Sequence, residues 1–307
     1  MTTFRLGINT CFAVKRWPLP SDWARIVKEE WGLDFVQHSL DLVDVQAPSD
    51  LFEAEAESVR EACEEYGLTL DSTFTGLAAY SSNILLDPRA EVRTYWEQWL
   101  GRAMEFTAKA GGRFTGGHVG AFSIPVWLDE RRRAQATREL KAALLRLTEL
   151  AKRLELEGVY VENMAVAREP STMAQVEELL SAGDQRHTPV VLCLDVGHEC
   201  VVGSTGAERD PYAWLQHFGE RLGCAHIQQS DAENDHHWPF VDRFNRQGRI
   251  EAERVLEVLG ATGADEVKLF LEVIPAFEQD DDQVLADLGE SVRYWQDALA
   301  ARAPSVY

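Results

Sequence analysis

Residues 190–198 read VVLCLDVGH, and this stretch decides the fold. Five apolar residues run without interruption to Asp195, and a histidine follows three positions later. A short unbroken apolar run of this kind is typical of a parallel strand that is buried on both faces. Similar segments, bounded by glycine, proline or polar residues, recur along the chain. The eight strands that we expect span residues 4–9, 34–38, 69–74, 113–118, 159–162, 190–195, 225–228 and 269–273.

Amphipathic patterns separate these strands. Apolar residues recur at three- and four-residue spacing over residues 92–106, 140–154 and 285–299, which predicts helices with one buried face. Eight strand–helix units of about 38 residues are the signature of a (β/α)8 TIM barrel, so we expect residues 1–307 to form a single domain of that class. An open doubly wound sheet is the alternative, but the G-x-G-x-x-G motif that usually follows its first strand is absent.

Three local motifs mark the starts of helices. Asp87-Pro88 and Asp210-Pro211 each place a carboxylate before a proline, so we expect the aspartate to cap a helix and the proline to occupy its first position. Thr172 and Gln175 have the spacing of a capping box, in which each side chain bonds to the backbone N–H of the other residue.

The composition excludes several classes of protein. With 45% hydrophobic and 26% charged residues, the chain is neither disordered nor fibrous. Its 51 acidic residues exceed its 30 lysines and arginines and give a net charge of −21. This charge argues against a nucleic-acid partner, because lysines and arginines provide the affinity for phosphate backbones.

The N-terminus and the cysteines favour the cytoplasm. The first residues, MTTFRLGIN, lack the basic segment and apolar run of a signal peptide, and no apolar run in the chain approaches the roughly 20 residues that span a bilayer. The cysteines are odd in number and form no C-x-x-C motif, so we expect reduced residues in the core. They are Cys11, Cys63, Cys193, Cys200 and Cys224.

Charged or imidazole side chains stand at the ends of four consecutive strands in the second half of the chain. They are Glu162, Asp195, His226 and Glu272. The active sites of TIM barrels lie at this end of the strands. A single buried carboxylate could cap a helix or form a salt bridge, but three converging ones repel each other unless a cation lies between them. This mixed oxygen and nitrogen set suits Mn²⁺, Mg²⁺ or Co²⁺, with Zn²⁺ as an alternative.

The segments around these residues resemble those of a known family. They read VEN at 161–163, LDVGH at 194–198, AHIQ at 225–228 and LEV at 271–273. They are similar to the motifs of the xylose-isomerase-like TIM-barrel superfamily, in particular its ketose 3-epimerases and related sugar-phosphate isomerases and epimerases. The resemblance covers essentially the whole chain. It implies that the four strand-end residues bind one divalent ion, with Mn²⁺ as the first choice, that both glutamates transfer protons, and that the protein is a homodimer or homotetramer.

The substrate contacts that the resemblance implies centre on His198. The family usually continues its seventh strand with an aspartate and an arginine, whereas residues 230–240 here read SDAENDHHWPF, so Asp231 fits and a histidine stands in place of the arginine. The candidate substrate-binding residues are His198, His118, Asp231, His237, Arg243, Arg246 and Trp17. The candidate phosphate ligands are Arg243, Arg246, Lys15, Arg16 and Arg168.

The residue types fit isomerisation or epimerisation next to a ketone. Removal of the weakly acidic C–H proton needs a base, and a divalent ion stabilises the resulting ene-diolate. For epimerisation one glutamate takes the proton and the other returns it on the opposite face, which requires separated pKa values for Glu162 and Glu272. We therefore expect a metal-dependent isomerase or epimerase of a ketose or ketose phosphate, of the 3-epimerase type, with tetrulose and pentulose phosphates among its candidate substrates.

Other functions remain open at this point. A keto-inositol dehydratase or an aldose–ketose isomerase would use the same metal site and differ only in the fate of the ene-diolate. A DNA-repair endonuclease with this barrel would need several metals, more histidine and carboxylate ligands, and a basic surface, against which the net charge of −21 argues. A non-catalytic sugar sensor would not need both glutamates.

Overall fold

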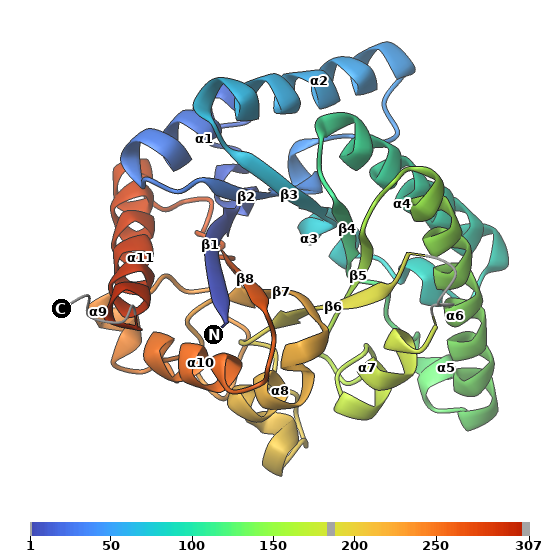
Figure 1. Ribbon diagram of the computed structural model, residues 1–307. Helices are drawn as coiled ribbons and strands as arrows, with labels where there is room; N and C mark the ends of the chain where they lie inside the picture. Colours follow the sequence, from blue (N-terminus) through green and yellow to red (C-terminus); the bar gives the residue numbers. More distant parts are fainter. Residues whose placement is uncertain (1, 183–187, 303–307) are drawn as a thin grey trace.

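The computed structural model describes residues 2–182 and 188–302. Over this part of the chain, eight parallel strands form a closed barrel and pair in chain order, with β1 also pairing with β8 (Figure 1). The predicted (β/α)8 TIM barrel is therefore confirmed. The strands are β1 (Thr3–Asn9), β2 (Phe35–Ser39), β3 (Thr69–Phe74), β4 (Phe114–Gly117), β5 (Gly158–Glu162), β6 (Val190–Asp195), β7 (Leu222–Ile227) and β8 (Glu266–Leu271).

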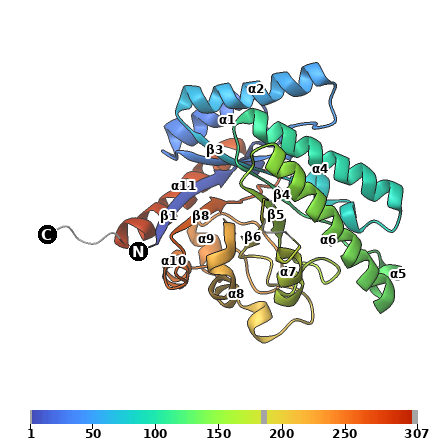
Figure 2. The same cartoon turned by 45° about the vertical axis from the view of Figure 1, so that its right-hand side comes forward.

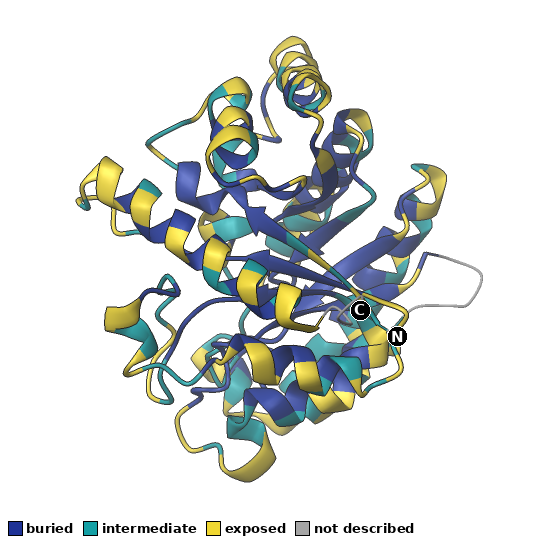
Figure 3. Ribbon diagram, turned by 60° about the vertical axis from the view of Figure 1, so that its left-hand side comes forward, coloured by how far each residue is buried: buried dark blue, intermediate teal, exposed yellow. Residues whose placement is uncertain are grey.

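Helices surround the barrel as an outer layer (Figure 2). Their apolar faces pack against the strands, so that buried residues fill the centre and exposed residues lie on the outward sides of the helices (Figure 3). The α-helices are α1 (Pro20–Arg25), α2 (Ser49–Tyr66), α3 (Gly76–Tyr80), α4 (Ala90–Ala110), α5 (Ile124–Trp127), α6 (Glu130–Arg153), α7 (Met173–Leu180), α8 (Pro211–Phe218), α9 (Asp242–Asn245), α10 (Ala252–Gly260) and α11 (Asp281–Arg302).

Two strands begin several residues earlier than the sequence predicts. β7 and β8 start at Leu222 and Glu266, each three residues before the predicted position. In β8 the charged residue Lys268 is part of the strand, because its ammonium group pairs with the buried carboxylate of Asp71 at 2.8 Å inside the barrel. In the sequence alone, Lys268 indicates that the strand has not yet begun. In the fold, its partner Asp71 comes from β3, so the lysine can lie inside β8.

The predicted helix starts are confirmed in two of three places. Asp210 caps α8, and the capping box is present at the start of α7. The prediction for Asp87 was wrong, because α4 begins only at Ala90. The Asp87 carboxylate instead accepts hydrogen bonds from the backbone N–H and the guanidinium group of Arg89, which keeps the chain extended before the helix.

Two further sequence expectations concern cysteines and membranes. The five cysteines are buried and form no disulfide, as predicted. Within the described residues, the structure contains no helix with the length and apolar character needed to cross a bilayer.

Candidate functional site

The four predicted metal ligands lie together at the C-terminal end of the barrel. Glu162 and Asp195 are the last residues of β5 and β6, His226 lies near the end of β7, and Glu272 directly follows β8. Each offers one nitrogen or oxygen atom, and these atoms all lie within 4.8 Å of one another. All four side chains are buried. We call these residues the four-residue cluster.

The hydrogen bonds of His226 fix which of its nitrogens faces the cluster. Its Nε2 lies 2.6 Å from the Oε1 atom of Gln37, which also accepts a hydrogen bond from Asn9, so Nε2 carries the proton. In the neutral imidazole Nδ1 is then an acceptor that faces Glu272 Oε2 at 2.9 Å and Glu162 Oε1 at 3.6 Å. Such a contact is repulsive unless a cation lies between the atoms, either a metal ion or a proton on Nδ1. Without a metal ion, the two carboxylates outweigh the effect of burial and hold the pKa of His226 well above its usual value.

A second acceptor in the cluster also lacks a partner. Asp195 Oδ1 accepts hydrogen bonds from the backbone N–H of Gly197 and the amide of Gln228, whereas Asp195 Oδ2 and His226 Nδ1 are buried without a hydrogen-bond partner. Unpartnered acceptors of two residue types that converge beside two carboxylates match the ligand set of a divalent metal ion. The residues present therefore fit the ion that the sequence predicts.

Asn163 holds two elements of the site in place. Its side chain accepts a hydrogen bond from the backbone N–H of Asp195 at 2.8 Å and donates to the Asp195 carbonyl at 3.0 Å and to Glu199 at 3.1 Å. Its own carbonyl oxygen accepts a hydrogen bond from Nδ1 of His198 at 2.6 Å. Asn163 thus ties the end of β5 to the end of β6.

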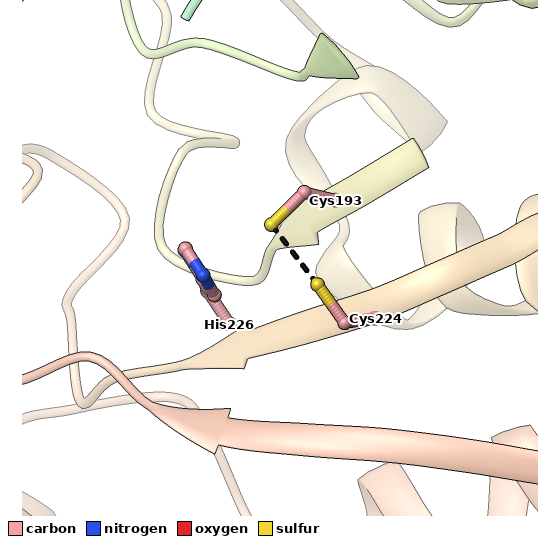
Figure 4. Close-up of side chains that lie close together, drawn as sticks. All are labelled: Cys193, Cys224 and His226. Carbon is pink, nitrogen blue, oxygen red and sulfur yellow. Dashed lines mark hydrogen bonds between the residues drawn. The ribbon is translucent and has the colours of Figure 1, made fainter. Parts of the chain in front are cut away.

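Two thiols form the floor beneath His226. Cys193 and Cys224 face each other in register on β6 and β7, with their sulfur atoms 3.4 Å apart (Figure 4). Both are fully buried. The four-residue cluster therefore lies next to buried thiols and away from the surface, where uncompensated charges are costly.

The environments of the two glutamates separate their pKa values. Burial raises the pKa of Glu162 to about 7. Burial alone would also raise the pKa of Glu272, but the attraction of His226 and His237 outweighs it and lowers that pKa to about 2. In the metal-free protein Glu272 is therefore a carboxylate near neutral pH, whereas Glu162 can hold a proton.

A pocket of about 560 Å³, including its open mouth, lies above the cluster. Residues from the C-terminal ends of all eight strands, or from the loops that follow them, line it. They are Cys11, Asp41, Phe74, Gly76, Leu77, Tyr80, His118, Glu162, Met164, His198, Asp235, His237, Glu272 and Ile274.

One wall of the pocket is α3, which is fixed by Asp41. The Asp41 carboxylate accepts hydrogen bonds from the backbone N–H groups of Leu77 at 2.8 Å and Ala78 at 2.7 Å. Gly76 has a φ of +67°, and a Cβ atom there would lie 2.3 Å from Asp41 Oδ2. Only glycine allows the carboxylate to approach this closely.

Three of the predicted substrate-binding residues line the pocket: His198, His118 and His237. Burial lowers the pKa of His118 to about 4, so its imidazole is neutral and can both donate and accept a hydrogen bond. His237 enters the pocket with a φ of +50°. Its neighbour His236 instead stacks on Trp238, with ring centroids 3.6 Å apart.

The remaining predicted contacts lie elsewhere. Arg243 pairs with Asp287, and Arg246 pairs with Asp242 on the surface. Asp231 accepts hydrogen bonds from two backbone N–H groups of its own loop and lies 3.0 Å from His236, and Trp17 packs against Phe12. None of these four is among the pocket-lining residues, so we assign them no contact with a ligand there.

The other candidate phosphate ligands also have partners of their own. Arg16 binds the Asp281 carboxylate and the carbonyl oxygen of Ala276, and Arg168 binds the carbonyl oxygen of Phe122. Lys15 lies 4.2 Å from the ring of Phe277, in the loop that follows the pocket residue Ile274.

Sequence reasoning missed three residues of the site. Asp235 lines the pocket between His198 and His237, Gln37 bonds His226, and Asn163 bonds Asp195. Asn163 stood in the VEN motif, which was a usable signal. Gln37 and Asp235 have no distinguishing pattern around them.

Comparison with known proteins agrees with this geometry. The model of the family described as "Xylose isomerase-like TIM barrel" matches residues 26–297. The chain belongs to the xylose isomerase-like TIM barrel family.

Several known proteins resemble this chain over nearly its whole length. D-erythrulose 1-phosphate 3-epimerase from Brucella abortus (strain 2308) is 25% identical over 296 residues, which are 94% of this chain and 94% of that protein. A crystal structure from Rhodospirillum rubrum, described provisionally as a xylose isomerase, is 33% identical, with a TM-score of 0.89 and coverage of 96% of this chain and 99% of that chain. The structure of an L-ribulose 3-epimerase has the same fold, with 18% identity, a TM-score of 0.68 and full coverage of both chains.

Proposed function

We propose that this protein is a divalent-metal-dependent 3-epimerase of a short-chain ketose or ketose phosphate. The observation that carries the proposal is the pair of buried glutamates in the four-residue cluster, which line one pocket from the ends of two different strands. Epimerisation needs one group that takes a proton and another that returns one. Glu272 and Glu162 meet these two requirements in a single pocket.

Each residue has a definite task in this reaction. A divalent ion bound to the four-residue cluster would polarise the carbonyl and the adjacent hydroxyl group of the ketose. Glu272, which is ionised, removes the proton from the carbon next to the carbonyl. Glu162 delivers a proton to the opposite face of that carbon. His118 and His198 orient the sugar by hydrogen bonds to its hydroxyl groups.

The substrate that we favour is a tetrulose or pentulose, and its phosphate is included because the Brucella relative is named for a tetrulose phosphate. Among the described residues, the pocket lining contains no lysine or arginine. A phosphate group would therefore lie at the mouth, where Lys15 is the candidate contact.

The test is proton exchange in D₂O. Metal-loaded protein is incubated with C4 to C6 ketoses and their 1-phosphates, and NMR follows deuterium incorporation at C3 together with the new epimer. Glu162→Gln and Glu272→Gln should each abolish turnover, whereas the exposed control Glu253→Gln on α10 should not. Exchange at the wild-type rate in either site variant would contradict the roles assigned here.

A further inference from the structure

Glu199 is a buried carboxyl group to which the proposed reaction assigns no task. It lies four residues after Asp195, in the loop that follows β6, and its side chain is only 1% exposed. It is not among the residues that line the pocket, so we assign it no contact with a bound sugar. Burial of a carboxyl group costs free energy unless its oxygens find partners. The partners of Glu199 therefore show what it does.

The first partner, Asn163, lies where the pairing of β5 with β6 ends. The last paired residues of these two strands are Glu162 and Cys193. Beyond them the side-chain amide of Asn163 bonds the backbone of Asp195: its oxygen accepts from the N–H at 2.8 Å, and its nitrogen donates to the carbonyl at 3.0 Å. A neighbouring strand would bond the same two backbone groups if the sheet continued. The position of Asp195 thus depends on one side chain.

Glu199 fixes the orientation of that side chain. The amide nitrogen of Asn163 carries two hydrogens, of which the Asp195 carbonyl accepts one and Glu199 Oε1 accepts the other at 3.1 Å. The amide therefore cannot rotate without losing a buried hydrogen bond. The second oxygen of Glu199, Oε2, lies 3.9 Å from the guanidinium group of Arg249, which donates to the carbonyl of Arg209 at 2.6 Å.

Two groups of the candidate site depend on the position of Asn163. Asp195 Oδ2 is buried without a hydrogen-bond partner, so its direction follows that of the backbone that carries it. His198 is also attached to Asn163, because its Nδ1 lies 2.6 Å from the backbone carbonyl oxygen of Asn163. A shift of Asn163 would move a candidate metal ligand and a candidate substrate contact together.

We propose that Glu199 is a positioning residue of the metal site, which acts through Asn163 on Asp195. It sets the direction of the Asp195 carboxylate without itself binding the ion. This inference rests on the metal binding proposed above. Removal of an outer partner of a metal ligand lowers metal affinity by about 10–100-fold. We expect the lower end of that range for Glu199, because it acts through a second residue.

Two neutral variants of Glu199 separate its hydrogen bond from its charge. Glu199→Met and Glu199→Gln have similar volumes and both remove the carboxylate beside Arg249, but only glutamine offers an acceptor to Asn163. The full-length protein is stripped of metal with a chelator, and MnCl₂ is titrated into it in a calorimeter. We expect the Kd to rise about tenfold in Glu199→Met and to stay within about twofold of wild type in Glu199→Gln.

A double-mutant cycle tests whether the effect passes through Asn163. Asn163→Leu should raise the Kd at least as much as Glu199→Met does, and the double variant should show no further rise. The control is Glu208→Met, because the Glu208 carboxylate accepts a hydrogen bond from the backbone N–H of Met173 at 3.1 Å, at the start of α7. This variant should lower the Tm without changing the Kd.

The outcomes distinguish two kinds of failure. If folded wild-type protein does not bind Mn²⁺, the proposed metal site is refuted and this inference with it. Three results refute the positioning role alone: wild-type affinity in Glu199→Met, equal losses in Glu199→Met and Glu199→Gln, or losses that multiply in the double variant. Circular dichroism identifies a variant that has not folded. Glu199→Ala then replaces Glu199→Met, and if Asn163→Leu is unfolded the comparison with Glu199→Gln decides.

Discussion

Replacing Gln37 by methionine tests how the barrel orients its histidine ligand. Gln37 Oε1 accepts hydrogen bonds from His226 Nε2 at 2.6 Å and from Asn9 Nδ2 at 2.7 Å, and all three side chains are buried. Methionine has a similar volume but offers no comparable acceptor, so the variant keeps the packing, leaves the buried N–H of His226 without a partner, and leaves Asn9 Nδ2 with only its longer contact to Glu272 at 3.5 Å. Each unsatisfied donor costs about 1–3 kcal/mol.

The loss should appear in metal affinity as well as in stability. Removal of the outer partner of a metal-bound histidine lowers affinity by about 10–100-fold, which corresponds to about 1.4–2.7 kcal/mol. We therefore expect Gln37→Met to lower the Tm of the metal-free protein and to raise the Kd for Mn²⁺ or Zn²⁺ by that factor. Gln37→Glu should restore affinity, because its carboxylate accepts the same hydrogen bond more strongly.

Calorimetric titration of metal into stripped protein measures the Kd, and thermal unfolding measured by circular dichroism gives the Tm. The control is Gln135→Met on the exposed face of α6, where the glutamine bonds only to Glu139. If Gln37→Met binds the ion with wild-type affinity while its Tm falls, the hydrogen bond stabilises the fold but does not orient the ligand, and the reasoning is refuted.

Three further predictions concern residues outside the four-residue cluster. Burial raises the pKa of Glu199 to about 8, so folding favours its protonated form, and the metal-free protein should lose stability as pH rises from about 4.5 to 8. Glu199→Gln should flatten this part of a plot of Tm against pH, and an unchanged slope would exclude Glu199 as the source of the pH dependence. Arg246→Ala should change the KM of an identified substrate less than twofold, because Arg246 pairs with Asp242 on the surface; a tenfold rise would place it in the site. Thr172→Ala removes one half of the capping box of α7 and should lower the free energy of unfolding by about 1 kcal/mol in urea titration, whereas no change would mean that water replaces the cap.

The sequence was sufficient to predict the barrel and the convergence of the four candidate metal ligands. Glu162, Asp195 and Glu272 each follow an apolar run, and a charge at that place is informative because a barrel brings the ends of its strands together. The order of the strands along the chain was therefore enough to predict that these residues converge, and the conformations of the loops did not have to be known.

The walls of the pocket could not be predicted in the same way. Adjacent histidines 236 and 237 are equivalent in the sequence, and only the left-handed backbone at His237 directs one into the pocket while the other stacks on Trp238. Arg243 looked available for a ligand, but its partner Asp287 comes from α11. Pairings between residues so distant in the chain leave no local pattern.

Because α3 is attached through Asp41, the shape of the pocket wall can change independently of the four-residue cluster. The residues that would perform chemistry stand on a hydrogen-bonded barrel, where almost any change disturbs several strands. The wall that shapes the cavity is a five-residue helix held by one carboxylate and one glycine. Mutations at Leu77 and Tyr80 can therefore accumulate and change which ligand fits, while Asp41 and Gly76 keep the wall in place. A laboratory that wishes to change what this pocket binds should randomise those two positions first.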